Sequence, residues 1–180
     1  IMAITINGSG SVTGLTSLPD TAMADGSVIQ VVTASTSTEG TVSNSTTAGN
    51  TNGTLVDSGL TATITPASAS NKVLVLVHQQ FWLDNGSDNS QSQISIVLRD
   101  GSNNNLVSAP GWDQLRFKDI KANAEYFDLS YLHSPNTDSA FTYKMSYCYW
   151  YISSGSGSLK SQYDNGASRA SYITLMEVAQ

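Results

Sequence analysis

The stretch that decides the fold runs from Val73 to Leu83 and reads VLVLVHQQFWL. Side chains alternate between the two faces of a strand, so the valines of the first half share one face and the leucines share the other. An antiparallel strand with one solvated face needs apolar residues on one side only. The run is also much shorter than the roughly 20 apolar residues of a membrane helix. It therefore predicts a strand covered on both sides, by the domain core and by a neighbouring subunit.

Two further segments carry apolar residues on both faces, Ile94 to Leu98 and Tyr172 to Val178. Burying each exposed Leu or Val of such faces would contribute about 1.5 to 3 kcal/mol. We therefore expect these segments to build a subunit interface together with the stretch at Val73. The residues predicted for this oligomer interface are Val73, Val75, Val77, Ile94, Ile96, Tyr172 and Leu175.

The composition suits β structure. Charged residues make up 12% of the 180 residues, about half of the roughly 25% typical of globular proteins. Ser, Thr, Asn and Gly take their place, and these residues favour turns and strands over helices. The net charge of −6 argues against a nucleic-acid partner and against anionic membranes. We also expect no membrane insertion and no secretory signal, and the single cysteine excludes an internal disulfide.

Turn signals divide residues 28–180 into about eight strand segments without helical periodicity, the pattern of a sandwich. The sequence therefore predicts an all-β fold, an antiparallel jelly-roll-like β-sandwich. The expected strands are Val28–Ala34, Leu60–Thr65, Val73–Leu83, Gln93–Arg99, Glu125–His133, Phe141–Ile152 and Ser171–Val178, with short strands near Leu106 and Phe117. Thr41–Thr47 is either a loop or a polar edge strand, and Ser153–Ser158 is expected to be a loop.

Residues 1–27 differ from this head domain, because they are rich in glycine and have too little apolar surface to fold alone. We interpret them as a short extended N-terminal arm that orders on another protein, with a flexible tail as the alternative. The apolar residues expected to make the attachment are Ile4, Ile6, Leu15 and Leu18.

Catalytic chemistry is not indicated, and we expect no catalytic residue, no cofactor and no metal. His78 and His133 are interpreted as structural histidines, and Cys148 as a packed thiol. The spacing of a zinc site does not occur. The pair Asp84 and Asp88 resembles a calcium loop faintly but lacks its ligand spacing and distal Glu, so a solvated loop is the better interpretation.

Exposed aromatic and amide side chains are the best candidates for ligand binding, since rings stack on sugars and amides hydrogen-bond to them. We expect them in tip loops at Asp84–Gln91, Asn103–Trp112 and Ser153–Gly166. The candidate residues are Trp82, Asp84, Asn85, Asp88, Asn89 and Trp112. The tyrosine row of Phe141–Ile152 is interpreted as core or interface instead.

Five pieces of the sequence occur in an order that resembles a family of β-rich phage virion proteins, described as tail-fibre-like or structural proteins of marine and environmental phages. They are VIQVV from Val28, LVDSGLTATITPASASNKVLVLV from Leu55, a strand ending in Leu98-Arg99-Asp100, LSYLHSPNTDSAFTYKM from Leu129 and ASYITLMEVA from Ala170. The N-terminal ITINGSGSVTGL followed by Leu-Pro-Asp resembles the attachment segment of short phage fibres. The sequence departs from the family at Ser35–Asn52 and at Asp84–Gln91.

The resemblance implies a virion location, a sandwich fold and a homotrimer, with other virion proteins of the tail or capsid as partners. It implies a non-enzymatic fibre or spike that displays its head for recognition of a host surface glycan or protein. The alternative is a capsid decoration or head-fibre protein that stabilises the shell. A carbohydrate-binding or depolymerising enzyme remains a third possibility.

Overall fold

The computed structural model describes residues 23–44, 54–84, 91–107, 115–118, 122–152, 157–163 and 169–180. The predicted attachment residues Ile4, Ile6, Leu15 and Leu18 lie outside the described residues, as do the loop candidates Asn85, Asp88, Asn89 and Trp112.

The described residues form strands and no helix, so no helix there could span a membrane. The strands are β1 (Val28–Thr36), β2 (Gly40–Asn44), β3 (Val56–Ile64), β4 (Lys72–Asp84), β5 (Gln91–Asp100), β6 (Asn105–Val107), β7 (Leu115–Lys118), β8 (Ala122–His133), β9 (Phe141–Ile152), β10 (Gly157–Ser161) and β11 (Ser171–Val178).

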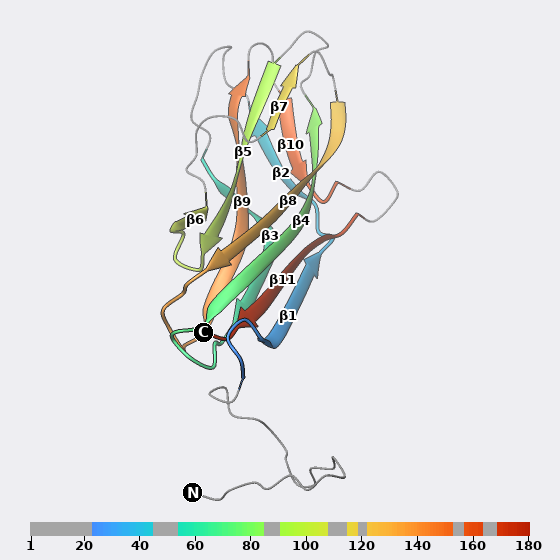
Figure 1. The fold of residues 1–180 in the computed structure, drawn as a ribbon. Helices are drawn as coiled ribbons and strands as arrows, with labels where there is room; N and C mark the ends of the chain where they lie inside the picture. Colours follow the sequence, from blue (N-terminus) through green and yellow to red (C-terminus); the bar gives the residue numbers. More distant parts are fainter. Residues whose placement is uncertain are drawn as a thin grey trace, which may run out of the picture.

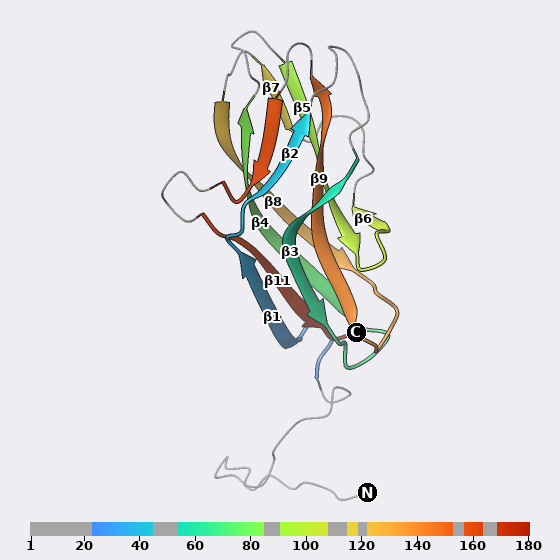
Figure 2. The ribbon, with the colours of Figure 1, turned by 180° about the vertical axis from the view of Figure 1, so that it is seen from behind.

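The strands form two antiparallel sheets that face each other (Figures 1 and 2). In sheet A, β4 pairs with β8 on one side and with β11 and then β10 on the other. Outside these, β1 pairs with β11 and β2 pairs with β10. β10 and β11 therefore occupy one interrupted strand position, and β1 and β2 occupy another. In sheet B the order is β3, β9, β5, and the far edge of β5 pairs with both β6 and β7.

The strand order is that of a jelly roll. Counting the couples β1–β2, β6–β7 and β10–β11 as one position each leaves eight positions in chain order, and they alternate between the sheets as 1-8-3-6 and 2-7-4-5. Eight strands in two sheets with Greek-key connections define this architecture. The predicted antiparallel jelly-roll-like sandwich is thus confirmed, while the predicted trimer remains a prediction.

The core lies between the sheets and is built from alternate residues of the long strands. Sheet A contributes the odd-numbered residues of β4 and Leu175 of β11, and sheet B contributes Ile94, Ile96 and the inward tyrosines of β9. Tyr143 and Tyr147 are among the largest fully buried side chains.

This arrangement corrects the predicted oligomer interface. Six of its seven residues are enclosed within one chain, with exposed fractions between 0% and 4% for Val73, Val75, Val77, Ile94, Ile96 and Leu175. Alternation shows that β4 has two apolar faces but does not show which of them is the core. The valine face is the core, and the leucine face lies outside. Only Tyr172, which is 53% exposed, lies on an outer surface as predicted.

The region around β10 also differs from the prediction. The expected loop Ser153–Ser158 overlaps a strand, Gly157–Ser161, that pairs with both β2 and β4. Its sequence GSLKS has one apolar residue, Leu159, which is fully buried, so no alternation marks the strand. The polar segment near Thr41 does form the edge strand β2.

Both ends of the described chain meet at one end of the sandwich, here called the base. The backbone N–H of Gly26 donates to the Ala179 carbonyl, and the Ala179 N–H donates to Ser27, both at 2.9 Å. The opposite end, the tip, is where β4 ends at Asp84 and β5 begins at Gln91 (Figure 1).

Candidate functional site

The outer face of sheet A is the most apolar surface of the described residues. The described residues include six exposed large hydrophobic side chains, and five of them project from this face. The sixth, Val56, belongs to β3 of sheet B. The five are Val28, Val31, Tyr126, Leu132 and Tyr172. Soluble monomers rarely leave large contiguous apolar patches in water, so such a face indicates an interaction site.

Strand register gathers the aliphatic residues near the base. Leu74 of β4 pairs with Met176 of β11 and with Leu132 of β8, and Met176 in turn pairs with Val31 of β1. Paired residues of antiparallel strands share a face. One row therefore crosses the whole sheet, and Val28 and Val178 continue it toward the base. We call these residues the apolar half: Val28, Val31, Leu74, Leu132, Met176 and Val178.

Nearer the tip, the same face becomes polar and aromatic. His78 pairs with Tyr172 on one side and with Asp128 on the other. Its Nδ1 lies 2.6 Å from Oδ1 of Asp128, so the imidazole donates to the carboxylate. The ring of Tyr126 stacks on His78 at 4.8 Å between centroids, and Arg169 donates to the Tyr126 hydroxyl at 3.2 Å. These contacts hold His78 and Asp128 in one orientation.

A groove of about 520 Å³ lies on this face beside His78 and Asp128. It is lined by Leu76, Val77, His78, Asp128, Leu129, Ser130, Tyr172 and Thr174. Its size falls within the range of about 300 to 1,000 Å³ seen for small-molecule sites. Three strands, β4, β8 and β11, supply its lining, so the rigid sheet fixes its shape.

The predicted ligand residue Trp82 is occupied by intramolecular contacts. Its ring stacks on Tyr163 at 4.7 Å, and the ammonium of Lys160 lies 4.7 Å from the centre of the Tyr163 ring. Lys160 also forms an ion pair with Glu39 at 2.8 Å. Asp84 ends β4 at the tip, and only its backbone is described. Asn103, at the start of another predicted tip loop, lies instead in the turn between β5 and β6, at the end of β5 that points away from the tip.

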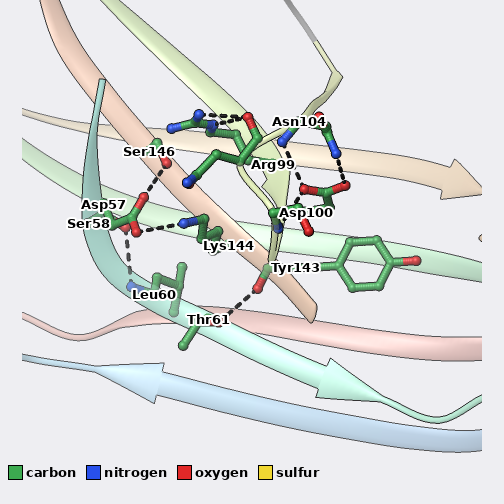
Figure 3. A network of polar contacts seen from close by, with 12 residues as sticks. Asp57, Ser58, Leu60, Thr61, Arg99, Asp100, Asn104, Tyr143, Lys144 and Ser146 are labelled. Atoms are coloured by element: carbon green, nitrogen blue, oxygen red, sulfur yellow. Dashed lines mark hydrogen bonds and ion pairs between the residues drawn. The ribbon is translucent and has the colours of Figure 1, made fainter. Parts of the chain in front are cut away.

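A polar network occupies the outer face of sheet B (Figure 3). Asp57 accepts hydrogen bonds from Lys144 at 2.8 Å and from Ser146 at 2.7 Å. Burial would raise the pKa of Asp57, but these two donors and the charges of Lys144 and Arg99 outweigh it and lower the pKa. Because the carboxylate is fully engaged, we interpret the network as a link between β3 and β9.

The neighbouring turn is held in a similar way. Asp100 accepts from the backbone N–H groups of Ser102 and Asn104, both at 2.8 Å, and from the Asn104 amide at 2.7 Å (Figure 3). Its small burial would raise the pKa, and the hydrogen bonds from Asn104 and Ser102 lower it. Arg99 donates to the Asn103 carbonyl, so both charged residues close the turn.

The other titratable candidates have structural surroundings. His133 contacts the Tyr143 hydroxyl at 2.9 Å, and burial lowers its pKa. Cys148 is fully buried, and burial raises the pKa of its thiol to about 11, which makes it a weak nucleophile. Both agree with the predictions for these residues. Within the described ranges, no three His, Cys, Asp or Glu side chains cluster as metal ligands.

No protein-family model and no curated protein matches the chain. A chain of the structure of infectious bursal disease virus, Gx strain, aligns with 11% sequence identity and a TM-score of 0.39. The alignment covers 100% of this chain and 43% of that one, so this chain spans less than half the length of the viral chain.

Proposed function

We propose that the chain is a non-enzymatic structural component of a phage virion, fibre- or spike-like, that assembles through the outer face of sheet A. The apolar half of this face carries the proposal. Val31 is 53% exposed and Leu132 is 50% exposed, in a chain with few charges overall. Jelly rolls occur in viral capsid and lectin domains, which supports this class of protein.

The proposed assembly is a homotrimer in which the apolar half meets neighbouring subunits. The row from Val31 to Leu132 crosses four strand positions, which at about 4.8 Å per strand is roughly 15 to 20 Å wide. A standard interface buries about 800 Å² on each partner, so the proposed contact extends from this row over neighbouring parts of the face. The proposal keeps the predicted contact between subunits but assigns it to the opposite face of β4, which carries Leu74.

The proposed attachment uses residues 1–27. Because the described chain begins at the base, an arm that docks there would leave the tip directed away from the particle. The test is to delete residues 1–22 and measure incorporation into particles, with the Val56→Ala variant of the full chain as a control. Loss of incorporation by a folded truncated protein supports the arm, and normal incorporation refutes it.

The alternative is a capsid decoration protein, which would share the jelly roll and the apolar face. Particles that lack the protein separate the two roles. Reduced adsorption with unchanged heat resistance supports the fibre, whereas reduced heat resistance with normal adsorption supports decoration. Release of reducing sugars from host polysaccharide by the purified chain would contradict the non-enzymatic assignment.

A further inference from the structure

We propose that the groove beside His78 and Tyr172 binds a neutral carbohydrate. The inference deepens the proposed host-surface role and rests on it for its biological meaning. It places recognition on the flat outer face of sheet A, whereas the sequence placed it in the tip loops.

An exposed aromatic ring borders the groove. Tyr172 is 53% exposed although it lies in the middle of the face, next to His78. The apolar face of a sugar ring packs on an aromatic ring in such a position, and the tyrosine hydroxyl stays free to hydrogen-bond. Leu76 supplies an apolar side chain, and Val77 and Leu129 also line the groove. At about 520 Å³ the groove has room for a short oligosaccharide.

The polar lining suits hydroxyl groups. Ser130, Thr174 and Tyr172 offer hydroxyls that both donate and accept. The Asp128 carboxylate is 72% exposed, and His78 holds it through Oδ1. Its Oδ2 has no hydrogen bond among the described residues, so it can accept from a ligand hydroxyl. A carboxylate fixed before the ligand arrives loses little entropy on binding.

Charge decides which carbohydrate fits. The chain carries a net charge of −6, and one of its carboxylates, Asp128, lies at the groove itself. Sialylated, sulfated and phosphorylated sugars would be repelled by this charge. A neutral oligosaccharide has no such penalty, and its hydroxyls match the donors and acceptors of the lining.

The same residues do not form a hydrolytic centre. Ser130, His78 and Asp128 have the residue types of a catalytic triad, and all three line the groove. The mechanism requires the serine hydroxyl to hydrogen-bond to the imidazole. His78 bonds to Asp128, but no hydrogen bond joins it to Ser130 in the described structure. The described side chains are therefore not arranged as a catalytic triad.

The test is a glycan array probed with the full chain, with neutral and anionic oligosaccharides printed side by side, followed by calorimetry with the strongest neutral ligand. We expect binding to neutral glycans only. Tyr172→Ala should weaken binding about tenfold through the lost stacking. Tyr172→Phe keeps the ring and loses one hydroxyl, so it should weaken binding less than Tyr172→Ala. Asp128→Asn should weaken it about tenfold through the lost charged acceptor.

Two controls separate this site from assembly and from general surface changes. Asp138→Asn removes an exposed carboxylate outside the groove and should leave binding unchanged. Leu132→Asp lies in the apolar half, so it should alter assembly and preserve binding. Absence of neutral-glycan binding at millimolar concentration, equal binding by Tyr172→Ala, or loss of binding in Leu132→Asp would each overturn the groove proposal. None of these results bears on incorporation into particles, which tests the proposed function separately.

Discussion

Glu177 is the buried charge on which the base of the sandwich depends. It is 0% exposed and accepts three hydrogen bonds, from Gln30 at 2.6 Å, from the Ala67 N–H at 2.8 Å and from Asn71 at 2.7 Å. The donors come from β1 and from the turn between β3 and β4. A single carboxylate therefore joins segments that are more than 100 residues away from it in the chain.

We expect Glu177→Gln to lower the free energy of unfolding by about 2 to 3 kcal/mol. Glutamine keeps the shape, but its NH₂ group would face donors, and a buried group that loses a charged hydrogen bond costs about this much. Urea denaturation followed by circular dichroism measures the change. Asp138→Asn, an exposed carboxylate, serves as the control and should stay within about 0.5 kcal/mol. Equal stabilities of Glu177→Gln and wild type would contradict the assignment.

Asp57 predicts a dependence of stability on pH. Its pKa is lowered in the folded chain, so it binds its proton less readily there than in the unfolded chain, where the value is about 3.9. Its contribution is therefore present above about pH 4 and disappears as the pH falls through the folded value. Its side chain is 50% exposed, so we expect Asp57→Asn to cost only about 0.5 to 1 kcal/mol at pH 7.

The measurement is urea denaturation of wild type and Asp57→Asn at several pH values. The difference between them should be constant from pH 5 to pH 7 and should shrink below about pH 4. A difference that grows on acidification would have the wrong sign and would refute the role of the Lys144 and Ser146 contacts.

At this scale the sequence predicted the burial of a side chain better than its hydrogen-bond partners. Cys148 was predicted to be a packed thiol, and it is buried, although alternation places it on the strand face opposite Tyr147. The contacts of Glu177 could not be predicted, because an acidic residue in a strand is normally solvated and its three donors are distant in sequence. Likewise, only register shows that Asp128 faces His78.

Among the elements, β3 depends on a single glycine. The pairing of β3 with β9 shifts register between Asp57 and Thr61, and Gly59 within this bulge has φ of 80°. A side chain is disfavoured by about 1 to 2 kcal/mol in this region of backbone conformation. A Cβ at Gly59 would meet only the Thr36 hydroxyl at 3.8 Å, so space is available and backbone strain alone should act.

Gly59→Ala should therefore lower the free energy of unfolding by about 1 to 2 kcal/mol, measured by thermal or urea denaturation. Ser35→Ala, at an exposed position of β1, is the control and should change it by less than about 0.5 kcal/mol. A Gly59→Ala protein as stable as wild type would show that the bulge tolerates a side chain. The bulge matters to the polar network, because it places Asp57 opposite Ser146.

Elements held by polar contacts were the hardest to predict. Between β10 and β11, the buried Ser171 hydroxyl accepts hydrogen bonds from the Gln79 amide and from the Gln80 N–H, both at 3.0 Å. The Tyr163 N–H donates to Gln80 at 2.8 Å. The long strands followed from apolar alternation, whereas here glutamines and serines fill buried positions, and no sequence pattern distinguishes them from loop residues.

For the whole molecule, the architecture followed from the pattern but the orientation of its central strand did not. Eight strand positions with turn signals and no helix predicted a jelly-roll-like sandwich. Both faces of β4 are aliphatic, so the choice between Val75 and Leu74 as core depended on pairing with distant strands. The error exchanged the two faces of the sheet, and the proposed assembly still needs a partner that covers the outer one.

That need leads to a prediction about assembly. Val31 and Leu132 are half-exposed in one chain, so aspartate at either position should leave the fold of that chain intact. In an assembly through the apolar half, the same substitutions would bury an unpaired carboxylate, which is strongly unfavourable. We expect the wild type to be a trimer by light scattering and Val31→Asp/Leu132→Asp to be a monomer with an unchanged circular dichroism spectrum.

Val56→Asp is the matched control, because Val56 is a 37% exposed valine of β3 in the other sheet. It should remain a trimer. A monomeric wild type would leave the apolar half to a different partner, and a trimer that survives the double substitution would place the interface elsewhere. Loss of the trimer in both variants would show sensitivity to added charge rather than to position. The interface is assigned to the apolar half only if the trimer is lost in the double variant and kept in Val56→Asp. Both variants replace exposed apolar residues with aspartate, so the position of the substitution then explains the difference.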